Sequence, residues 1–143
     1  MEDLTEIYNE LIMEHGMNSY NKKDLKCATC CKMGHNPNCG DEIKLQLKLN
    51  GDIIEDASFT GHGCAISQAS TSIMIDVLKG KNIYEARDIV KTFIDMIKRD
   101  TKNEEDLEKL EDAIAFRNVS NMPARVKCAL LAWHTIEDML NKE

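Results

Sequence analysis

The sequence predicts an α+β fold, in which a small antiparallel β-sheet has helices packed on one of its faces. Two observations lead to this prediction. Apolar and polar residues alternate from Asp41 to the dipeptide Asn50-Gly51, as in a strand with one wet face that enters a tight hairpin turn. Beyond residue 64 the apolar residues recur with the spacing of amphipathic helices. A sheet followed by a run of helices is typical of this fold class.

The first element is expected to be an amphipathic helix over residues 3–15, with Gly16 as its stop. Its apolar residues recur three and four positions apart, as one helix face requires. They are Leu4, Ile7, Tyr8, Leu11 and Ile12. Residues 17–38 are predicted to be irregular, because Asn, Lys, Gly and other polar residues dominate them.

The hairpin follows this irregular segment. Its first strand starts at Asp41, and a return strand is expected from about Asp52 to Phe59. Because the helices are expected to pack on the apolar face of the hairpin, its polar face is predicted to be exposed to solvent, that is, wet. A two-residue turn brings the outer ends of both strands side by side, so the chain near Asp41 is expected to lie beside Cys64.

Four helices are predicted after the hairpin. Gly80 ends the first, and Asn82 with Glu85 three residues later forms a capping pattern for the second. Acidic residues favour a start of the third near Asn103, and Pro123 suits the first turn of the last.

The charge balance excludes several classes of partner. The chain has 25 acidic and 18 basic residues and a net charge of −7, so it is expected to repel nucleic acid and anionic membranes. No apolar run approaches the roughly 18 residues that a membrane span needs. The acidic first ten residues do not resemble a secretory signal. A cytoplasmic location and a single domain over residues 1–143 are therefore predicted.

Six cysteines in a cytoplasmic chain are expected to be metal ligands or reactive thiols rather than disulfides. Three of them stand among turn residues and charges: Cys39, Cys64 and Cys128. The sequence predicts that these three thiols and the carboxylate of Asp41 meet around one metal ion. Three thiolates and a carboxylate can form a tetrahedral Zn(II) site or a site that binds iron and sulfide.

Such a donor set brings four negative charges, which a divalent ion offsets only in part. Arg125 and Lys127, close to Cys128 in the sequence, are predicted to compensate; a solvated helix start is the alternative for both. His62, two residues before Cys64, raises the rival possibility of Cys/His nucleophilic catalysis. No third orienting group is evident, so an exposed loop position is favoured for His62.

A second group of cysteines, Cys27-Ala28-Thr29-Cys30-Cys31 followed by His35, lies in the irregular segment. A lone C-x-x-C pair is a weak zinc signal, because a structural zinc site usually takes two such pairs. The group could hold a second metal, form a redox pair, supply spare thiols, or consist of loop cysteines with no fixed role. The sequence leaves these alternatives open.

Three blocks of the sequence resemble the signatures of the NifU/IscU iron–sulfur assembly family. They come in the family's order, and the likeness covers nearly the whole chain, which implies one NifU-like N-terminal domain with a SufE/NifU-like fold. The chain is most similar to the SufU branch. Lys127 stands where IscU-type scaffolds carry a histidine, and an extra segment falls around residues 85–118. The blocks are Asn36–Asp41, Gly61–Ser70 and Ala124–Trp133.

For a SufU-like protein the resemblance implies a zinc site and a thiol that takes persulfide sulfur from a pyridoxal-phosphate cysteine desulfurase of the SufS type. Cys39 matches the acceptor thiol, which zinc restrains until a histidine of the partner replaces it. Arg125 matches a basic residue that supports the site. The implied zinc ligands are Cys39, Asp41, Cys64 and Cys128.

Three functions remain open after this resemblance. The first is a zinc-dependent sulfurtransferase that acts with a cysteine desulfurase, and the second is a scaffold that assembles a transient [2Fe–2S] or [4Fe–4S] cluster on the same ligands. The third is a structural zinc domain without transfer chemistry. Downstream iron–sulfur assembly proteins are expected as further partners. The group Cys27–Cys31 is not part of the family pattern and could relay persulfide or compete for metal.

Overall fold

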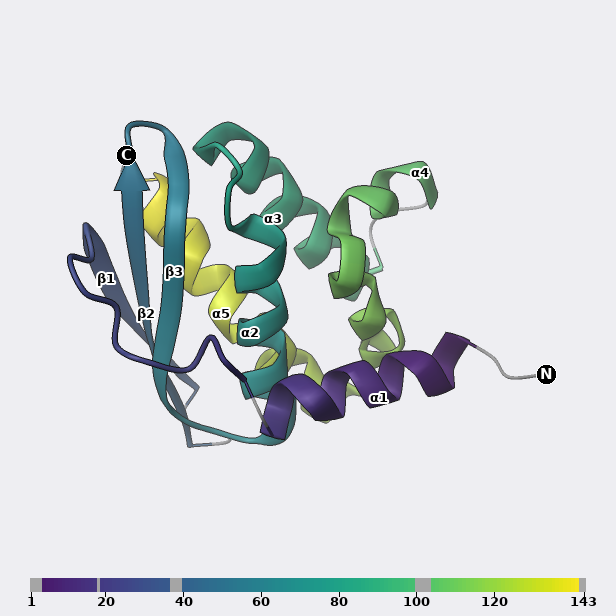
Figure 1. Cartoon of the computed structure of the whole chain (residues 1–143). Coiled ribbons are helices and arrows are strands. Elements are labelled where there is room, and N and C mark those ends of the chain that lie inside the picture. The colour runs from purple at the N-terminus through teal and green to yellow at the C-terminus, as the bar shows by residue number, and fades with distance from the viewer. Residues whose placement is uncertain (1–3, 18, 37–39, 100–103, 142–143) are drawn as a thin grey trace.

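The computed structural model describes residues 4–17, 19–36, 40–99 and 104–141. A three-stranded antiparallel sheet has its helices gathered on one face, which confirms the predicted α+β class (Figure 1). In chain order the elements are α1 (Leu4–Met17), β1 (Cys30–Asn36), β2 (Asp41–Asn50), β3 (Ile53–His62), α2 (Ala65–Leu78), α3 (Ile83–Ile97), α4 (Glu104–Leu107), the 3-10 segment η1 (Glu108–Asn121) and α5 (Pro123–Asn141).

The sheet has the strand order β1-β2-β3, with β2 in the centre. Gly51, in the turn between β2 and β3, has a φ of 62°, a left-handed conformation that glycine adopts without a steric penalty. The predicted hairpin is therefore confirmed, but its two turn residues are Gly51 and Asp52, because Asn50 pairs with Ile53; β3 extends to His62. The apolar residues of β2 that are fully buried are Ile43, Leu45 and Leu47.

The prediction of an irregular segment over residues 17–38 is wrong for Cys30–Asn36, which form strand β1. Few residues of this strand favour β-structure by themselves, so pairing with the open edge of β2 decides its conformation. Gly34 lets β1 approach α5 closely, since a Cβ at this position would lie 2.2 Å from Thr135 Oγ1. The sheet therefore has one more strand than the sequence predicts.

The segment between α1 and β1 covers part of the sheet face that is predicted to be wet. Its residues 21–23 form backbone hydrogen bonds with Phe59 at the outer edge of β3, the edge that does not pair with β2. Further on, the Leu25 N–H donates to Gln46 Oε1. Gln46 belongs to the polar series of β2, yet only 8% of it is exposed. The prediction of a wet face therefore holds only in part.

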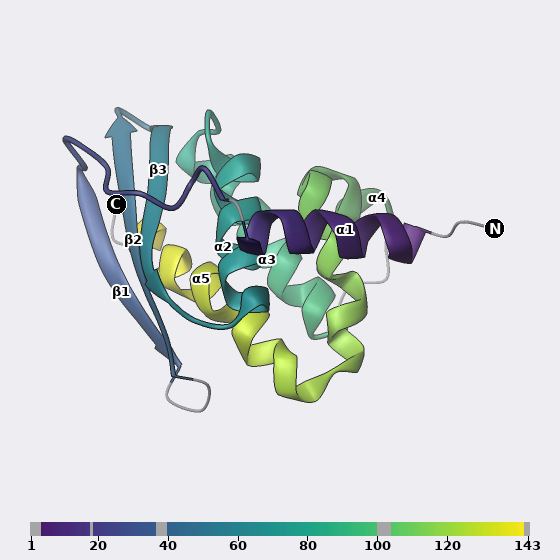
Figure 2. The same ribbon diagram turned by 60° about the horizontal axis from the view of Figure 1, so that its bottom comes forward.

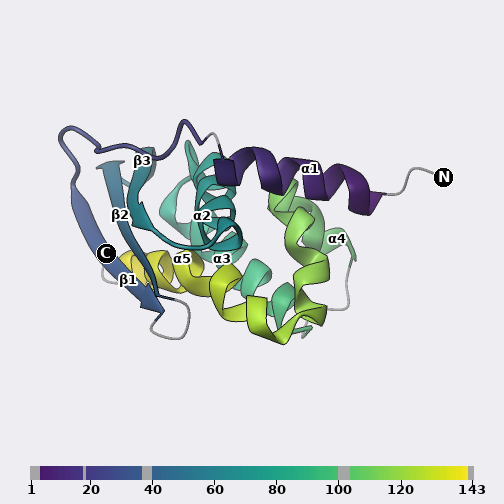
Figure 3. The same cartoon turned by 90° about the horizontal axis from the view of Figure 1, so that it is seen from below.

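Helices α2 and α5 lie against the sheet, and α3, α4 and η1 lie beyond them (Figures 2 and 3). Trp133 of α5 joins three helices. Its ring stacks on Phe93 of α3 with the ring centroids 3.8 Å apart, and its Nε1 donates to Ser70 Oγ of α2 over 2.9 Å. Among the described residues, no helix is long and apolar enough to cross a membrane.

Two predicted helix starts are confirmed. Asn82 caps α3, because its Oδ1 accepts a hydrogen bond from the Glu85 N–H over 2.8 Å. Pro123 is the first residue of α5, where its missing N–H is not needed. The third helix is described from Glu104; its predicted start, Asn103, lies outside the described residues.

Two details of the helices differ from the prediction. Gly16 does not stop α1, which continues to Met17; instead it faces the start of α2, where a Cβ would lie 3.1 Å from the Ala65 carbonyl oxygen. The third helix is not continuous, because α4 ends after four residues and η1 contains a kink at Glu111. Glu111 has a φ of 51°, which no regular helix accommodates.

Candidate metal centre

Three side chains that the sequence predicts to meet do come together. Asp41 begins β2, Cys64 precedes α2, and Cys128 lies in the second turn of α5. Their ligand atoms all lie within 4.8 Å of one another. Asp41 is fully buried, Cys128 is 2% exposed, and Cys64 is half-buried. Cys39, the fourth predicted ligand, lies outside the described residues.

The hairpin explains why Asp41 meets Cys64. Glu42 pairs with His62, so the start of β2 lies beside the end of β3, which leads directly to Cys64. There the Cys64 N–H donates to Asp41 Oδ1 over 2.8 Å, and Cys64 Sγ lies 4.0 Å from Asp41 Oδ2. Cys64 also caps α2, since its sulfur accepts from the Ser67 N–H over 3.4 Å. The backbone thus orients both donors.

Gly63 makes room for the Asp41 carboxylate. A Cβ at residue 63 would lie 2.6 Å from Asp41 Oδ1, closer than such atoms approach in proteins. Gly61, within β3, also allows a close approach: its φ is 120°, and a Cβ there would lie 2.1 Å from the Glu42 carbonyl oxygen. The two glycines therefore fix the approach of β3 to Asp41.

Replacing Gly63 by alanine is expected to lower zinc affinity about tenfold or more, because the added methyl group displaces the Asp41 carboxylate without removing a donor. Competition with a chromogenic zinc chelator measures this change. Gly34→Ala is the control, since it drives a Cβ against another side-chain oxygen, that of Thr135. It should reduce stability and lower zinc affinity less than Gly63→Ala does, because its clash lies on a later turn of α5 and touches no proposed ligand. Equal zinc affinity of Gly63→Ala and the unaltered chain would contradict a ligand role for Asp41.

The donors fit a zinc ion in kind and nearly in spacing. Thiolates bind Zn(II) at about 2.3 Å and carboxylates at about 2.0–2.2 Å, so ligand atoms of a tetrahedral site lie roughly 3.3–3.8 Å apart. The three atoms here lie within 4.8 Å of one another, which exceeds that spacing by about 1 Å. Two sulfurs and one oxygen leave room for one more donor, as the prediction for Cys39 requires.

The two predicted supporting cations lie at the start of α5. Arg125 and Lys127 are both exposed, and neither forms an ion pair in the ranges that the structure describes. His62 is exposed as well, as predicted, although it is the last residue of β3 rather than part of a loop. Its Nε2 lies 3.8 Å from Glu42 Oε2, so its neighbour is a carboxylate on the adjacent strand.

The second cysteine group is spread over two sides of β1. Cys30 packs partly against the core, whereas Cys31, the next residue, is exposed on the opposite face. Cys27 precedes the strand and is exposed. Within the described part of the chain, Asp41, Cys64 and Cys128 are the one set of three such ligand atoms that lie close together. The geometry thus gives no support to a second metal site at Cys27–Cys31.

A partly buried polar cluster that the sequence does not reveal ties α1 to α2. His15 Nδ1 lies 2.7 Å from Ser72 Oγ, and His15 Nε2 lies 3.7 Å from Asp76 Oδ2. The order of these groups is that of a hydrolytic triad, but Ser72 is fully buried and no substrate can reach it. Tyr20 donates to Asp76, and this hydrogen bond raises the pKa of the Tyr20 hydroxyl. The cluster therefore holds the two helices together.

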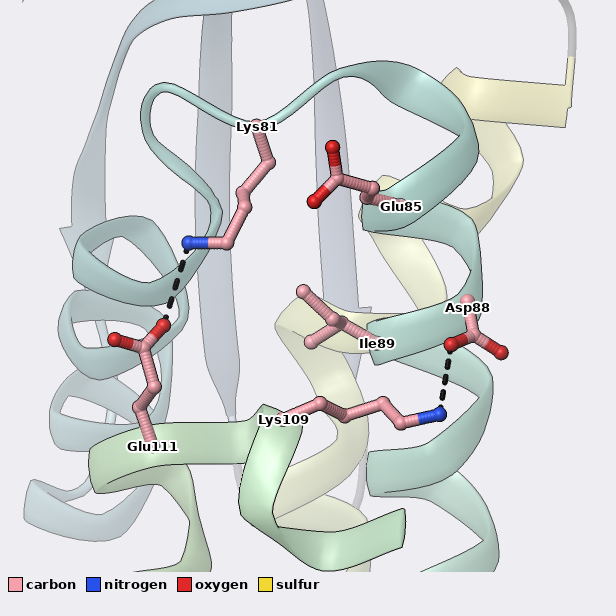
Figure 4. A pocket seen from close by; sticks show the side chains of 6 residues that line it. All are labelled: Lys81, Glu85, Asp88, Ile89, Lys109 and Glu111. Carbon is pink, nitrogen blue, oxygen red and sulfur yellow. Dashed lines mark hydrogen bonds and ion pairs between the residues drawn. The ribbon is translucent and has the colours of Figure 1, made fainter.

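A cavity of about 400 Å³ between α3 and η1 lacks the chemistry of a metal centre. Figure 4 shows two ion pairs at its walls, Lys81 with Glu111 and Lys109 with Asp88. Both lysines are thus paired with acids, and no thiol or imidazole lines the cavity. Its lining residues are Lys81, Glu85, Asp88, Ile89, Lys109 and Glu111.

Comparison with known proteins identifies the family to which this chain belongs. Residues 7–129 match the model of the NifU-like N-terminal domain. The chain therefore belongs to the NifU-like N-terminal domain family, and within it the relatives below mark it as a SufU-type member.

The relatives span almost the whole chain. It is 44% identical to the zinc-dependent sulfurtransferase SufU of Bacillus subtilis, covering 99% of this chain and 94% of that protein. It is 35% identical to the iron–sulfur cluster assembly scaffold protein IscU of Thermotoga maritima, covering 95% and 94%. A crystal structure of a scaffold protein for the SUF system from Fervidobacterium islandicum, described as putative, superimposes with a TM-score of 0.87 at 38% identity, covering 96% of this chain and 99% of that one.

Proposed function

We propose that this chain is a zinc-dependent sulfur acceptor, which takes persulfide sulfur from a pyridoxal-phosphate cysteine desulfurase for iron–sulfur cluster assembly. The observation that carries the proposal is the convergence of Asp41, Cys64 and Cys128 within 4.8 Å. The SufU relative, named a zinc-dependent sulfurtransferase, supports it.

Cys39 is the acceptor thiol in this proposal and the fourth zinc ligand. It precedes Asp41 by two residues, so its Cα lies no more than about 7 Å from that of Asp41 by chain length alone. When bound, zinc keeps its cysteine ligands deprotonated at neutral pH. Arg125 and Lys127 supply positive charge beside a donor set that is negative overall.

The transfer is a thiol–disulfide type of exchange. The Cys39 thiolate attacks the outer sulfur of the persulfide on the desulfurase. A sulfur–sulfur bond forms at Cys39 while the one on the donor breaks, and the donor cysteine leaves as a thiolate. Electrons balance without an added oxidant or reductant, and the sulfane sulfur arrives on Cys39 as a persulfide.

The second candidate function is a scaffold on which iron and sulfide are assembled as cargo. The match to IscU of Thermotoga maritima over 95% of this chain favours it. Protein purified without oxygen separates the two functions. Stoichiometric zinc without colour supports the acceptor, and a brown protein with acid-labile sulfide supports the scaffold.

The decisive experiment measures desulfurase turnover, as alanine formed from L-cysteine, with and without this protein. We expect zinc-loaded protein to raise turnover, and zinc-stripped protein or Cys39→Ala to abolish the increase, because the acceptor thiol is then misplaced or missing. Cys31→Ala, which removes an exposed thiol of β1, should keep the increase. A full increase with Cys39→Ala would move the acceptor role to another thiol, and no increase with the unaltered protein would overturn the function.

A further inference from the structure

A pocket of about 300 Å³ opens between the end of β1 and the first half of α5, next to the candidate metal centre. Its position follows from the residues that line it. Lys127 directly precedes Cys128, and Asn36 pairs with Asp41 across the sheet. We call it the β1–α5 pocket. It is lined by His35, Asn36, Lys127, Leu130, Leu131 and His134.

The charge of this pocket differs from that of the molecule. The chain as a whole carries −7, and the proposed zinc ligands are anionic, so an anion that approaches the centre is repelled. None of the described residues that line the pocket is acidic, whereas Lys127 supplies a positive charge and two histidines stand beside it. Two acids flank these groups: Glu137 Oε1 lies 3.4 Å from His134 Nδ1, and Glu42 stands opposite His35 across the sheet. Lys127 is therefore the feature of the pocket that favours an anion.

One wall of the pocket is apolar. Leu130 and Leu131 form it, and burial of the side chain of a bound segment against them is favourable. Gly34 of β1 lies against α5 near Thr135 and Leu131, which fixes the spacing between the two walls. An extended segment that carries a cysteine persulfide combines a side chain with a negative terminal sulfur, and both features have a partner here.

We infer that the β1–α5 pocket receives the persulfide-bearing segment of the sulfur donor, with Lys127 facing the terminal sulfur and the two leucines contacting the side chain. This inference rests on the proposed function and adds to it the place where the donor segment binds. Leu131 and His134 act as positioning residues, because they touch the donor segment and not the zinc ion.

The test compares Leu131→Glu with Leu131→Gln, two side chains of equal size and good helix propensity that differ in charge. Leu131 is half-buried, so both variants are expected to fold, which equal thermal midpoints and equal zinc content would verify. The readout is the concentration of this protein that gives half-maximal stimulation of desulfurase turnover. Titration calorimetry with the same desulfurase gives the affinity directly.

We expect Leu131→Glu to require at least about tenfold more protein than Leu131→Gln, since it places a negative charge where the anionic sulfur binds. If the unaltered protein stimulates the desulfurase and the two Leu131 variants match each other, the pocket inference is wrong and the acceptor function stands. If the unaltered protein does not stimulate, both fall.

Discussion

Replacing Asp41 by alanine is expected to lower zinc affinity at least about 100-fold. Loss of groups that merely orient a ligand already costs about 10–100-fold, and the carboxylate is proposed to bind zinc directly. The change also leaves the partly buried Cys64 N–H without its acceptor, which costs about 1 kcal/mol of folding free energy. Chelator competition and the thermal midpoint with and without excess zinc measure the two effects.

Asp41→Asn separates metal binding from structure. Its amide oxygen can still accept the hydrogen bond from the Cys64 N–H, so the metal-free protein should keep most of its stability. The neutral amide is a poorer zinc ligand, so affinity should still fall. If Asp41→Ala binds zinc as tightly as the unaltered protein, the proposed set of four ligands is incorrect.

Trp133→Ala should produce the largest loss of stability, about 3–5 kcal/mol of the free energy of unfolding. Trp133 is fully buried, stacks on Phe93 and donates to Ser70 Oγ, so its removal leaves a cavity between three helices. Chemical denaturation followed by circular dichroism measures the change. Because α5 also carries Cys128, zinc affinity should fall as well.

Trp133→Phe is the matched control. It keeps an aromatic ring for the stack on Phe93 and removes the indole N–H, whose net contribution is about 0.5–1.5 kcal/mol. Ser70 still donates to the Ala129 carbonyl oxygen over 2.6 Å, so no buried donor is left without a partner. A loss as large as that of Trp133→Ala would show that the hydrogen bond, not ring packing, dominates.

Local signals in the sequence were sufficient for the hairpin and for most of the helices. Asn50-Gly51 determines the turn, and once the turn is placed, the end of β3 must lie beside Asp41. The neighbourhood of Asp41 and Cys64 therefore follows from short-range geometry. The approach of Cys128 depends on how α5 packs, which a helix pattern alone does not give.

Strand β1 and the kink at Glu111 could not be predicted from local signals in the sequence. Cys30–Asn36 becomes a strand because β2 offers an open edge and α5 closes over Gly34, and both are long-range effects. Glu111 adopts a positive φ between two short helical pieces, where its side chain pairs with Lys81. The β1–α5 pocket could not be foreseen, because one of its walls is the missed strand.

The three clustered donors come from parts of the chain that are far apart in sequence, so an ion held by them would act as a cross-link. It would bridge β2, the start of α2 and α5, closing two large loops much as a disulfide does. Because such an ion binds the folded chain and not the unfolded chain, the supply of zinc would determine the lifetime of the protein in a cell as well as its activity. A shortage of zinc would then remove the protein through degradation, not merely silence it.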